Sequence, residues 1–495
     1  MEKQTRISKK LQKAREYEKC ALAKGTPVEK QIFHVCVPVG WMNDPNGFSE
    51  YQGEKHLFFQ YHPYKTVWGP MHWGHVKTAD FIRWENLPVA LAPDKKYDGF
   101  GCFSGSAIEW NGKHVLAYTG VERRKEENGE IKDYQMQCIA VGDGVNYRKI
   151  KENPVIAGDK IPAGDSVLDF RDPKIWADSD AIYMVVGNRA KDGSGQILMY
   201  RTTDLKQWEF VTVLDKSENR YGKMWECPDF FTLDGRDVLL VSPQEMEARG
   251  QDFHVGDGTI SILGDFDKEQ NIFTEKTVRA VDMGLDFYAP QTMQTSDGRR
   301  VMIAWMQSWS ASWFDERDGF CGMMTLPREI HIRNGILYQN PVRELEAYYK
   351  NKVEVKDIVS ENTYTKYEEL SGRVQNLDIS IEGDAAYKFE LRLAADDTHY
   401  TAIKYDKMEQ MLTFDRSNSG VRRDAAHIRN MRVLSNNRIV KLRVVMDRYS
   451  IELFVNDGEQ AMTSIIRTPF EIGGVYIKTQ GEVKAHVTKH DICLM

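Results

Sequence analysis

Three acidic residues lie in short motifs that combine a carboxylate with proline and polar or aromatic neighbours. They are Asp44 in WMNDPNG (41–47), Asp172 in DFRDPKIW (169–176) and Glu226 in MWECPDFF (224–231). Asn, Asp, Pro and Gly all favour turns, so the first motif by itself would be interpreted as a surface turn. The positions of the three acids along the chain favour a different interpretation.

Three carboxylates in one pocket suit cleavage of a glycosidic bond, in which one attacks the anomeric carbon and another protonates the leaving oxygen. Metal binding is the alternative, because hard cations prefer carboxylate oxygens. Arg171, next to Asp172, would compete with such a cation. His72 and His75 have a spacing seen at metal sites, but no third-ligand motif accompanies them, so we expect a structural or sugar-binding role. We therefore expect neither a metal nor a cofactor.

A repeat of roughly 60 residues would bring the acids together. Aromatic residues recur in one phase at Trp84, Tyr147, Trp208, Phe273 and Tyr338. Short apolar runs after turn signals repeat with them: HLFFQY (56–61), HVLAYTG (114–120), AIYMVVGN (181–188), DVLLVSPQ (237–244) and RVMIAWMQ (300–307). Such runs are typical of antiparallel strands joined by hairpins. Five sets arranged radially predict a five-bladed β-propeller, with a long sandwich of accidental spacing as the alternative.

The acidic motifs come one strand before the apolar run of their repeat. The other two repeats have GCFSGSA (101–107) and DFYAPQTM (286–293) at this position. The innermost strands of a propeller converge on its axis, so equivalent positions line one funnel. The residues that we expect to face one another there are Asp44, Ser104, Asp172, Glu226 and Tyr288.

The chain resembles glycoside hydrolase family 32, the invertases and sucrose-6-phosphate hydrolases. The motifs that carry the resemblance lie between residues 41 and 292 and are, in order, WMNDPNG, FFQYHP, WGPMHWGH, CFSGSA, FRDP, ECPDFF and DFYAPQT. The resemblance implies a five-bladed propeller followed by a β-sandwich. It also implies hydrolysis of β-fructofuranosides with retention of configuration.

Residue roles follow from the same resemblance. It implies that Asp44 is the nucleophile, Glu226 the general acid/base and Asp172 the stabiliser of the transition state. The positions that match the family's fructose subsite are Asn43, Gln60, Trp68, Ser104, Arg171 and Tyr288. From the residues themselves, we expect asparagine side chains and turn N–H groups to lower the pKa of Asp44, and Asp172 to stay charged beside Arg171.

Sucrose and sucrose 6-phosphate are the expected substrates. An exo-acting hydrolase of short fructans such as kestose or inulin-type chains, or a fructosyltransferase, is the alternative among enzymes. A carbohydrate-binding propeller without catalysis is the alternative of another class, although the three intact acids weigh against it. The sequence does not distinguish a monomer from a homodimer.

Bulk composition narrows the possible partners. The 495 residues are 41% hydrophobic and 28% charged, without an apolar run long enough to span a bilayer, so we expect no membrane partner. A net charge of −7 argues against nucleic acid. The charged N-terminus lacks a secretory signal, and seven scattered cysteines suit reduced thiols, so we expect a cytoplasmic protein.

The rest of the chain predicts three further units around the propeller at 31–340. Residues 1–30 contain charged helix formers before Gly25 and predict one helix outside the propeller. VRELEAYY predicts a linker helix within 341–351. Alternating strands such as YKFELRL (387–393) and SIELFVNDG (450–458) predict a sandwich over 352–495, for which we expect a stabilising or packing role.

Overall fold

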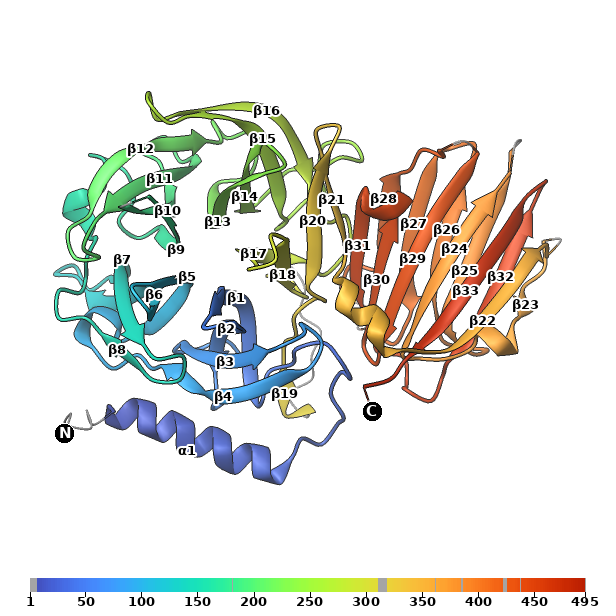
Figure 1. Ribbon diagram of the computed structural model, residues 1–495, viewed down its shortest axis with the longest axis horizontal. Coiled ribbons are helices and arrows are strands. Elements are labelled where there is room, and N and C mark those ends of the chain that lie inside the picture. The colour runs from blue at the N-terminus through green and yellow to red at the C-terminus, as the bar shows by residue number, and fades with distance from the viewer. Residues whose placement is uncertain are drawn as a thin grey trace.

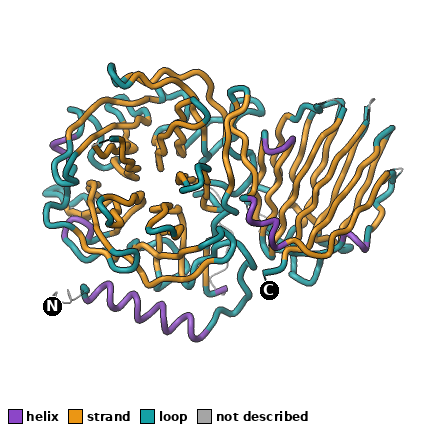
Figure 2. The backbone as a smooth tube through the Cα atoms, in the orientation of Figure 1, coloured by secondary structure: helices purple, strands orange, loops and turns teal. Residues whose placement is uncertain are grey.

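The computed structural model describes residues 7–179, 181–309, 318–360, 362–383, 386–421, 425–436 and 438–494. Within these residues, five small sheets surround a central axis and two larger sheets stack beside them (Figure 1). The fold is a five-bladed β-propeller followed by a β-sandwich, as the repeats and the alternating strands predicted. Strand dominates both parts, and the one long helix lies outside them (Figure 2).

Each blade is an antiparallel meander that starts at the axis. Blade one contains β1 (Gly40–Tyr51), β2 (Glu54–His62), β3 (His72–Thr78) and β4 (Trp84–Leu91). Blade two contains β5 (Gly101–Trp110), β6 (Lys113–Lys125), β7 (Ile131–Gly142) and β8 (Tyr147–Lys149). Blade three contains β9 (Phe170–Asp178), β10 (Ala181–Arg189), β11 (Gly195–Thr202) and β12 (Glu209–Lys216).

The last two blades follow the same order. Blade four contains β13 (Met224–Leu233), β14 (Arg236–Gln244), β15 (Ile260–Asp267) and β16 (Ile272–Ala280). Blade five contains β17 (Tyr288–Gln294), β18 (Arg300–Trp305), β20 (Arg328–Arg333) and β21 (Ile336–Pro341). Short 3-10 helices η1 (Lys96–Asp98) and η2 (Gly158–Lys160) connect earlier strands. The five acidic or equivalent motifs thus begin the first strands, and the apolar runs form the second strands.

The hydrophobic core lies between successive blades. Phe58 and Trp73 of blade one, for example, share a buried cluster with Leu116 and Tyr118 of blade two. The second strand of each blade has a neighbouring blade on each of its faces. Consecutive residues of β2, such as Phe58 and Phe59, are therefore both fully buried. This two-sided burial explains why these strands are continuous apolar runs rather than alternating ones.

In every blade, the hydrogen-bond ladder between the first and the second strand is interrupted at an equivalent place. The register shifts between Met42 and Pro45, Phe103 and Gly105, Arg171 and Lys174, Glu226 and Asp229, and Tyr288 and Gln291. Three residues in these bulges have a positive φ: Asp172 at 67°, Cys227 at 48° and Ala289 at 53°. A β-bulge bends its strand and re-aims a side chain, and bulges are frequent beside active sites.

The propeller ring is closed by contacts between the segment that precedes blade one and a segment inserted in blade five. Strand β19 (Phe320–Cys321) pairs in parallel with β1, with Gly40 opposite Phe320. The N–H of Met324 also donates to the carbonyl of Val35 at 2.8 Å. Residues just before blade one therefore hold residues inserted in blade five, which fastens the first blade to the last.

The sandwich consists of two six-stranded sheets within the described residues. One contains β22 (Tyr349–Ile358), β33 (Lys484–Ile492), β24 (Gln375–Glu382), β29 (Ile439–Asp447), β30 (Ser450–Val455) and β31 (Gln460–Ile465). The other contains β23 (Thr365–Lys366), β32 (Gly474–Gln480), β25 (Lys388–Ala395), β26 (Tyr400–Asp406), β27 (Met411–Asn418) and β28 (Ile428–Arg432). Short 3-10 helices η5 (Glu368–Leu370) and η6 (Asn456–Gly458) complete it.

The segment between the two parts is a 3-10 helix rather than an α-helix. Helix η4 (Arg343–Tyr348) lies inside the expected linker at 341–351, and β22 already begins at Tyr349. Leu345 of η4 is buried, Tyr348 packs against the same hydrophobic cluster, and Glu344 pairs with Arg299 at 2.6 Å, so several contacts anchor this turn. The first strand of the sandwich therefore follows the propeller almost directly.

A buried charged cluster joins the sandwich to the propeller. Asp447 of β29 accepts the N–H of Ile32 and His34 Nδ1, each at 2.9 Å. Glu452 of β30 accepts His34 Nε2 at 2.8 Å and Arg328 Nε at 3.0 Å. The two sandwich acids thus bind chain on both sides of the propeller's closure, residues 32–34 before blade one and Arg328 in blade five.

Helix α1 (Lys9–Lys24) runs along the outside of blade one (Figure 1). Ser8 caps it by accepting the N–H of Leu11 at 3.1 Å, and Gly25 ends it with a φ of 73°. Lys10 donates to the carbonyl of Pro93 and Arg15 to that of Val89. No helix among the described residues has both the length and the apolar character needed to cross a bilayer.

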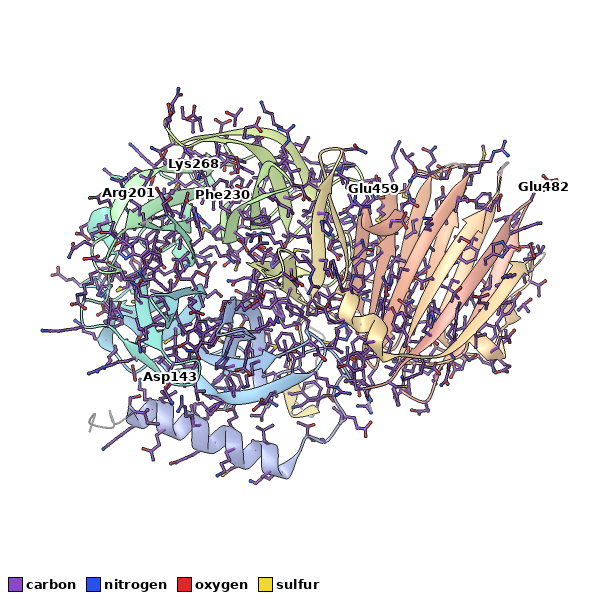
Figure 3. All side chains as sticks on the ribbon, in the orientation of Figure 1. Asp143, Arg201, Phe230, Lys268, Glu459 and Glu482 are labelled. Atoms are coloured by element: carbon purple, nitrogen blue, oxygen red, sulfur yellow. The ribbon has the colours of Figure 1, made fainter. Side chains whose placement is uncertain are left out.

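Charged side chains occupy the periphery of both parts. Arg201 and Lys268 lie at the outer edge of the propeller, and Glu482 lies at the far end of the sandwich (Figure 3). Exposed pairs such as Arg201 with Glu209, at 3.2 Å, contribute little to stability because water screens them. The charges that position a functional site are instead buried at the propeller axis.

Candidate active site

The first strands bring the expected funnel residues together around the axis. Asp44 lies on β1, Ser104 on β5, Asp172 on β9, Glu226 on β13 and Tyr288 on β17. Direct hydrogen bonds link Ser104 to Asp44 and Tyr288 to Glu226. All five residues are buried, since none has more than 9% of its surface exposed. The site is therefore built by five strands from five different blades.

Asp44 is held through both of its carboxylate oxygens. Ser104 Oγ donates to Oδ2 at 2.7 Å, and Asn43 Nδ2 donates to Oδ1 at 3.1 Å. Asn43 is itself oriented by Trp41, whose indole N–H donates to its amide oxygen at 2.8 Å. The bulge in β1 positions this set, and the carboxylate cannot rotate without losing a donor.

Cys227 lies between the two aspartates. Its backbone N–H donates to Asp172 Oδ2 at 3.0 Å, and its Sγ lies 3.6 Å from both Asp172 Oδ2 and Asp44 Oδ2. Burial and the three nearby acids raise the pKa of this thiol well above its usual value. Cys227 is therefore a neutral packing residue that sets the spacing of the acids rather than a nucleophile.

Glu226 is fixed by a cation and a phenol from the neighbouring blades. Arg171 Nε donates to Oε1 at 2.8 Å, and Tyr288 Oη donates to Oε2 at 2.6 Å. Tyr288 also lies 3.1 Å from the carbonyl oxygen of Ser242. Because both oxygens have a donor, the carboxyl group keeps one orientation toward the funnel.

Several residues that the sequence did not indicate complete the site. Gln135 accepts a bond from the N–H of Phe170 at 2.8 Å and lies 3.3 Å from Arg171 Nη1. Gln244 lies 3.3 Å from Arg171 Nη2, and Thr119 Oγ1 accepts the N–H of Asp172 at 2.9 Å. These residues lie on second and third strands, where no short motif marks them. A search for polar residues interrupting the apolar second strands would have found Thr119 and Gln244.

The electrostatics differ from what the sequence predicted for Asp44. Burial raises its pKa, the charge of Glu226 raises it further, and the bonds from Ser104 and Asn43 lower it without reversing the shift. The prediction of a lowered pKa was wrong, because it considered the local donors and not the depth of the pocket. A charge buried this deeply is costly whatever its nearest neighbours are.

Asp172 shows the same effect. The pKa of Asp172 is raised to about 7. Burial is the largest cause, the charge of Glu226 adds to the increase, and the charge of Arg171 opposes it. The expectation that Arg171 would keep Asp172 charged was also wrong, since the guanidinium bonds to Glu226 and Asp169 instead. Burial in this pocket thus raises the pKa of both aspartates.

The remaining predicted binding residues lie near the rim or one strand away. Gln60 of β2 is buried and donates to the carbonyl of Cys102 at 3.1 Å. Trp68 precedes β3, packs against Phe100 and Phe103, and is 39% exposed. The Trp68 ring therefore belongs to an aromatic group at the surface, whereas Gln60 belongs to the wall between blades one and two.

The two histidines of HWGH have separate structural environments. His72 Nδ1 lies 3.0 Å from the carbonyl oxygen of Pro70, while His75 stacks on Phe58 and contacts His56. Within the part of the chain that the structure describes, no group of three or more His, Cys, Asp or Glu side chains is arranged to hold a metal ion. The seven cysteines are all unpaired.

Comparison with known families and structures agrees with this architecture. Residues 34–341 match the N-terminal domain of glycosyl hydrolases family 32, and residues 344–492 match the C-terminal domain of that family. A sucrose-6-phosphate hydrolase from Zymomonas mobilis is 38% identical over 449 residues, which cover 88% of this chain and 85% of the relative. A raffinose invertase from Escherichia coli is 34% identical, with coverage of 88% and 89%.

Solved structures show the same fold over the whole chain. A Bombyx mori β-fructofuranosidase mutant in complex with sucrose superposes with a TM-score of 0.85 and 32% identity, covering 99% of each chain. A sucrose-6-phosphate hydrolase from Lactobacillus gasseri superposes with a TM-score of 0.83 and 26% identity, covering 99% of this chain and 97% of the other. Both domains of the family are matched in order along a chain that places its acids at the propeller axis, and the protein therefore belongs to glycoside hydrolase family 32.

Proposed function

We propose that the protein is a retaining β-fructofuranosidase that hydrolyses sucrose, sucrose 6-phosphate or both, and releases fructose. The observation that carries this proposal is the set of buried acids at the axis, Asp44, Asp172 and Glu226, each held by its own donors. The relatives named sucrose-6-phosphate hydrolase and raffinose invertase support the substrate class. No metal or cofactor takes part in this proposal.

Each acid has a separate role in the proposed reaction. The Asp44 carboxylate attacks C2 of the fructosyl unit while Glu226 gives its proton to the glycosidic oxygen. The bond between C2 and that oxygen breaks, and the glucosyl part leaves as an alcohol. Glu226 then accepts a proton from water, which attacks C2, releases fructose and frees the Asp44 carboxylate.

The surroundings of each acid suit these roles. Cys227 N–H holds Asp172 beside Asp44, which supports assigning the Asp172 carboxylate to accept hydrogen bonds from fructose hydroxyls. Arg171 and Tyr288 orient Glu226, which must act first as an acid and then as a base. We assign Asn43, Gln60, Trp68, Ser104, Arg171 and Tyr288 to fructose binding and to positioning of the acids.

The fructan exo-hydrolase and the fructosyltransferase remain the second candidates. They share the two-step chemistry and differ only in what occupies the outer part of the funnel or what accepts the fructosyl group. We also propose a cytoplasmic location, supported by seven cysteines without a disulfide, as suits a reducing compartment.

The test compares release of reducing sugar by wild type, Asp44→Asn and Glu226→Gln, with sucrose, sucrose 6-phosphate, kestose and inulin as substrates. We expect each variant to fold and to lose several orders of magnitude of kcat. Proton NMR of the first product should show β-fructofuranose before mutarotation, as retention requires. Near-normal turnover in either variant would reject the role of that residue, and an inverted product would reject the nucleophile.

A further inference from the structure

Arg171, which donates to Glu226, is also bound by a second carboxylate. Its Nε donates to Glu226 Oε1 at 2.8 Å, and its Nη1 donates to Asp169 Oδ1 at 3.0 Å. The side chains of Arg171 and Glu226 are both 11% exposed, so water and salt screen their contact only weakly. One guanidinium is therefore shared between the general acid/base and an acid that has no role in the proposed reaction.

Asp169 is paired in turn with a second arginine. Arg189, the last residue of β10, has its Nε 3.3 Å from Asp169 Oδ2. This Nε makes no directed hydrogen bond, so the contact is an ion pair. The side chains of Asp169 and Arg189 are 27% and 35% exposed. A line of alternating charge thus runs from the buried Glu226 through Arg171 and Asp169 to the partly exposed Arg189.

The backbone holds Asp169 in this line. Its N–H donates to Ser166 Oγ at 2.9 Å. Its carbonyl oxygen accepts the N–H of Arg189 at 3.2 Å and Nδ2 of Asn188 at 2.6 Å. The position of Asp169 just before β9 is therefore fixed by the fold and does not depend on its bond to Arg171 alone.

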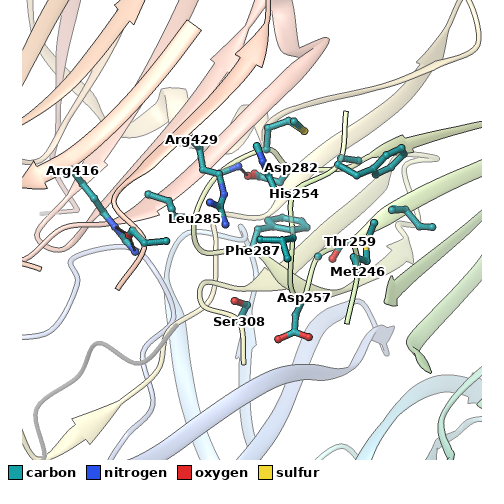
Figure 4. A pocket seen from close by; sticks show the side chains of 18 residues that line it. Met246, His254, Asp257, Thr259, Asp282, Leu285, Phe287, Ser308, Arg416 and Arg429 are labelled. Atoms are coloured by element: carbon teal, nitrogen blue, oxygen red, sulfur yellow. Dashed lines mark hydrogen bonds between the residues drawn. The ribbon is translucent and has the colours of Figure 1, made fainter. Parts of the chain in front are cut away.

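The other ionisable groups that interact with Glu226 are all acids. They are Asp44 on β1, Asp172 on β9, Cys227 on β13 and Tyr288 on β17. Asp257, on the wall of the cavity at the seam between propeller and sandwich (Figure 4), acts on Tyr288. Among the residues that the structure describes, Arg171 is thus the one cation in contact with the Glu226 carboxyl group. A change in the charge around Arg171 must consequently reach Glu226.

We propose that Asp169 and Arg189 are positioning residues that set the pH range over which Glu226 keeps the proton that it donates. The inference rests on the proposed function, which assigns Glu226 as the general acid/base. A cation beside a carboxyl group favours the ionised form, and a carboxylate beside that cation weakens the effect. Asp169 therefore helps Glu226 to keep its proton, and Arg189 limits this help.

Removal of the two charges should have opposite effects. In Asp169→Asn, the charge of Arg171 acts on Glu226 uncompensated, so the high-pH limit of kcat/KM should move down by about 0.5–1 pH unit. In Arg189→Gln, the Asp169 carboxylate acts more fully, so the limit should move up. The upward movement should be smaller, about 0.2–0.5 pH unit, because Arg189 is more exposed and acts through Asp169.

Initial rates of sucrose hydrolysis measured from acidic to alkaline pH give this limit, because the upper limb of kcat/KM reports the essential acid of the free enzyme. The variants Asp169→Glu and Arg189→Lys keep the charges and should keep the wild-type limit. Asp165→Asn is the matched control. It removes a carboxylate from the same segment, but one that bonds Gln196 and the N–H of Lys191 instead of Arg171, so the limit should not move.

A second measurement does not depend on turnover. Carbon-13 NMR of protein labelled at the glutamate carboxyl carbons follows Glu226 directly, and Glu226→Gln identifies its signal. We expect the pH at which this signal changes to be lower in Asp169→Asn and higher in Arg189→Gln than in wild type.

Three outcomes would overturn the proposal. They are a limit that moves in the same direction in Asp169→Asn and Arg189→Gln, a limit that moves in neither, and equal effects of Asp169→Glu and Asp169→Asn. Each would show that these residues act on the site through packing or not at all. A wild type that hydrolyses no fructoside would instead reject the proposed function, and the NMR titration would still decide whether the two charges reach Glu226.

Discussion

The hydroxyl of Tyr288 lies 2.6 Å from Oε2 of Glu226, and it reaches this carboxyl group from the next blade of the propeller. Tyr288→Phe should therefore fold normally and lose about ten- to a hundredfold in kcat/KM for sucrose, which corresponds to about 1.4–2.7 kcal/mol of transition-state stabilisation. The physical reason is that Glu226 would retain only Arg171 to orient it. Initial-rate measurements check this, with Tyr405→Phe in the sandwich as the control. Unchanged kcat/KM in Tyr288→Phe would show that Arg171 alone is sufficient.

Asp172→Asn should stabilise the protein above neutral pH while it lowers activity. The folded-state pKa of Asp172 is raised from 3.8 to about 7, so the folded protein holds this proton more tightly than the unfolded chain. Wild-type stability therefore falls as pH rises from about 4 to about 7, by up to about 4 kcal/mol at about 1.4 kcal/mol per pKa unit. Asparagine has no proton to lose and should avoid this decrease.

Differential scanning calorimetry at pH 4 and pH 8 measures the effect of Asp172→Asn. We expect a melting temperature a few degrees above that of wild type at pH 8 and similar to it at pH 4. Asp178→Asn, at the exposed end of the same strand, should change little at either pH. No gain in melting temperature at pH 8, or the same gain at pH 4 as at pH 8, would show that the buried charge is not the cause.

His34 should stabilise the contact between propeller and sandwich in a pH-dependent manner. Burial lowers the pKa of its imidazole, but the bonds to Asp447 and Glu452 outweigh burial and raise the value from 6.5 to about 9. A raised histidine pKa gives stability that is complete below about pH 6.5 and is lost as pH rises through about 9. The gap corresponds to about 3 kcal/mol.

The variant His34→Gln therefore should melt well below wild type at pH 6, because buried Asp447 loses its bonded cation and Glu452 retains only Arg328. At pH 10 the difference should be smaller, since the wild-type imidazole is then neutral. The exposed His399 provides the control His399→Gln, for which we expect no change. An equal loss of stability at both pH values would mean that packing, and not charge, is responsible.

Gly187→Ala should separate two of the catalytic strands. A Cβ at this position of β10 would lie 2.2 Å from the carbonyl oxygen of Trp225, which precedes Glu226 in β13. Relief of that clash moves blade four away from blade three, and thus Glu226 away from Arg171. We expect kcat to fall more than about tenfold with only a moderate loss of stability. In contrast, Gly258→Ala has its nearest neighbour at 3.9 Å and should leave kcat unchanged. Wild-type kcat in Gly187→Ala would show that the strands tolerate the shift.

The blade pattern could be predicted from the sequence because it depends on local periodicity. The apolar runs from 56–61 to 300–307 became second strands, since burial on both faces leaves a continuous apolar signal. The motifs around Asp44, Asp172 and Glu226 occupy one phase of that repeat, so their meeting at the axis followed from the fold. The expected wall residues Ser104 and Tyr288 followed from the same phase.

Features that depend on tertiary burial or on distant partners could not be predicted. The pKa of Asp44 shifts upward because the surrounding blades bury it beside Glu226, and local sequence carries no measure of that depth. His34 gave no signal, since its partners Asp447 and Glu452 lie 413 and 418 positions away along the chain. Gln135 gave no signal either, because only the folded strands place it against Arg171.

In the five first strands, the register shifts assign two functions to different residues. Bulge residues line the funnel, and the residues on either side of the bulge pair with the second strand. Residues in the bulges, such as Ser104, Asp172 and Cys227, lie where the ladder is interrupted, and the flanking residues keep the blade paired. A side chain in a bulge can consequently be exchanged without changing which faces of the strand are buried. Single substitutions in the bulges can thus change the specificity of the funnel while the pairing of the propeller strands remains the same.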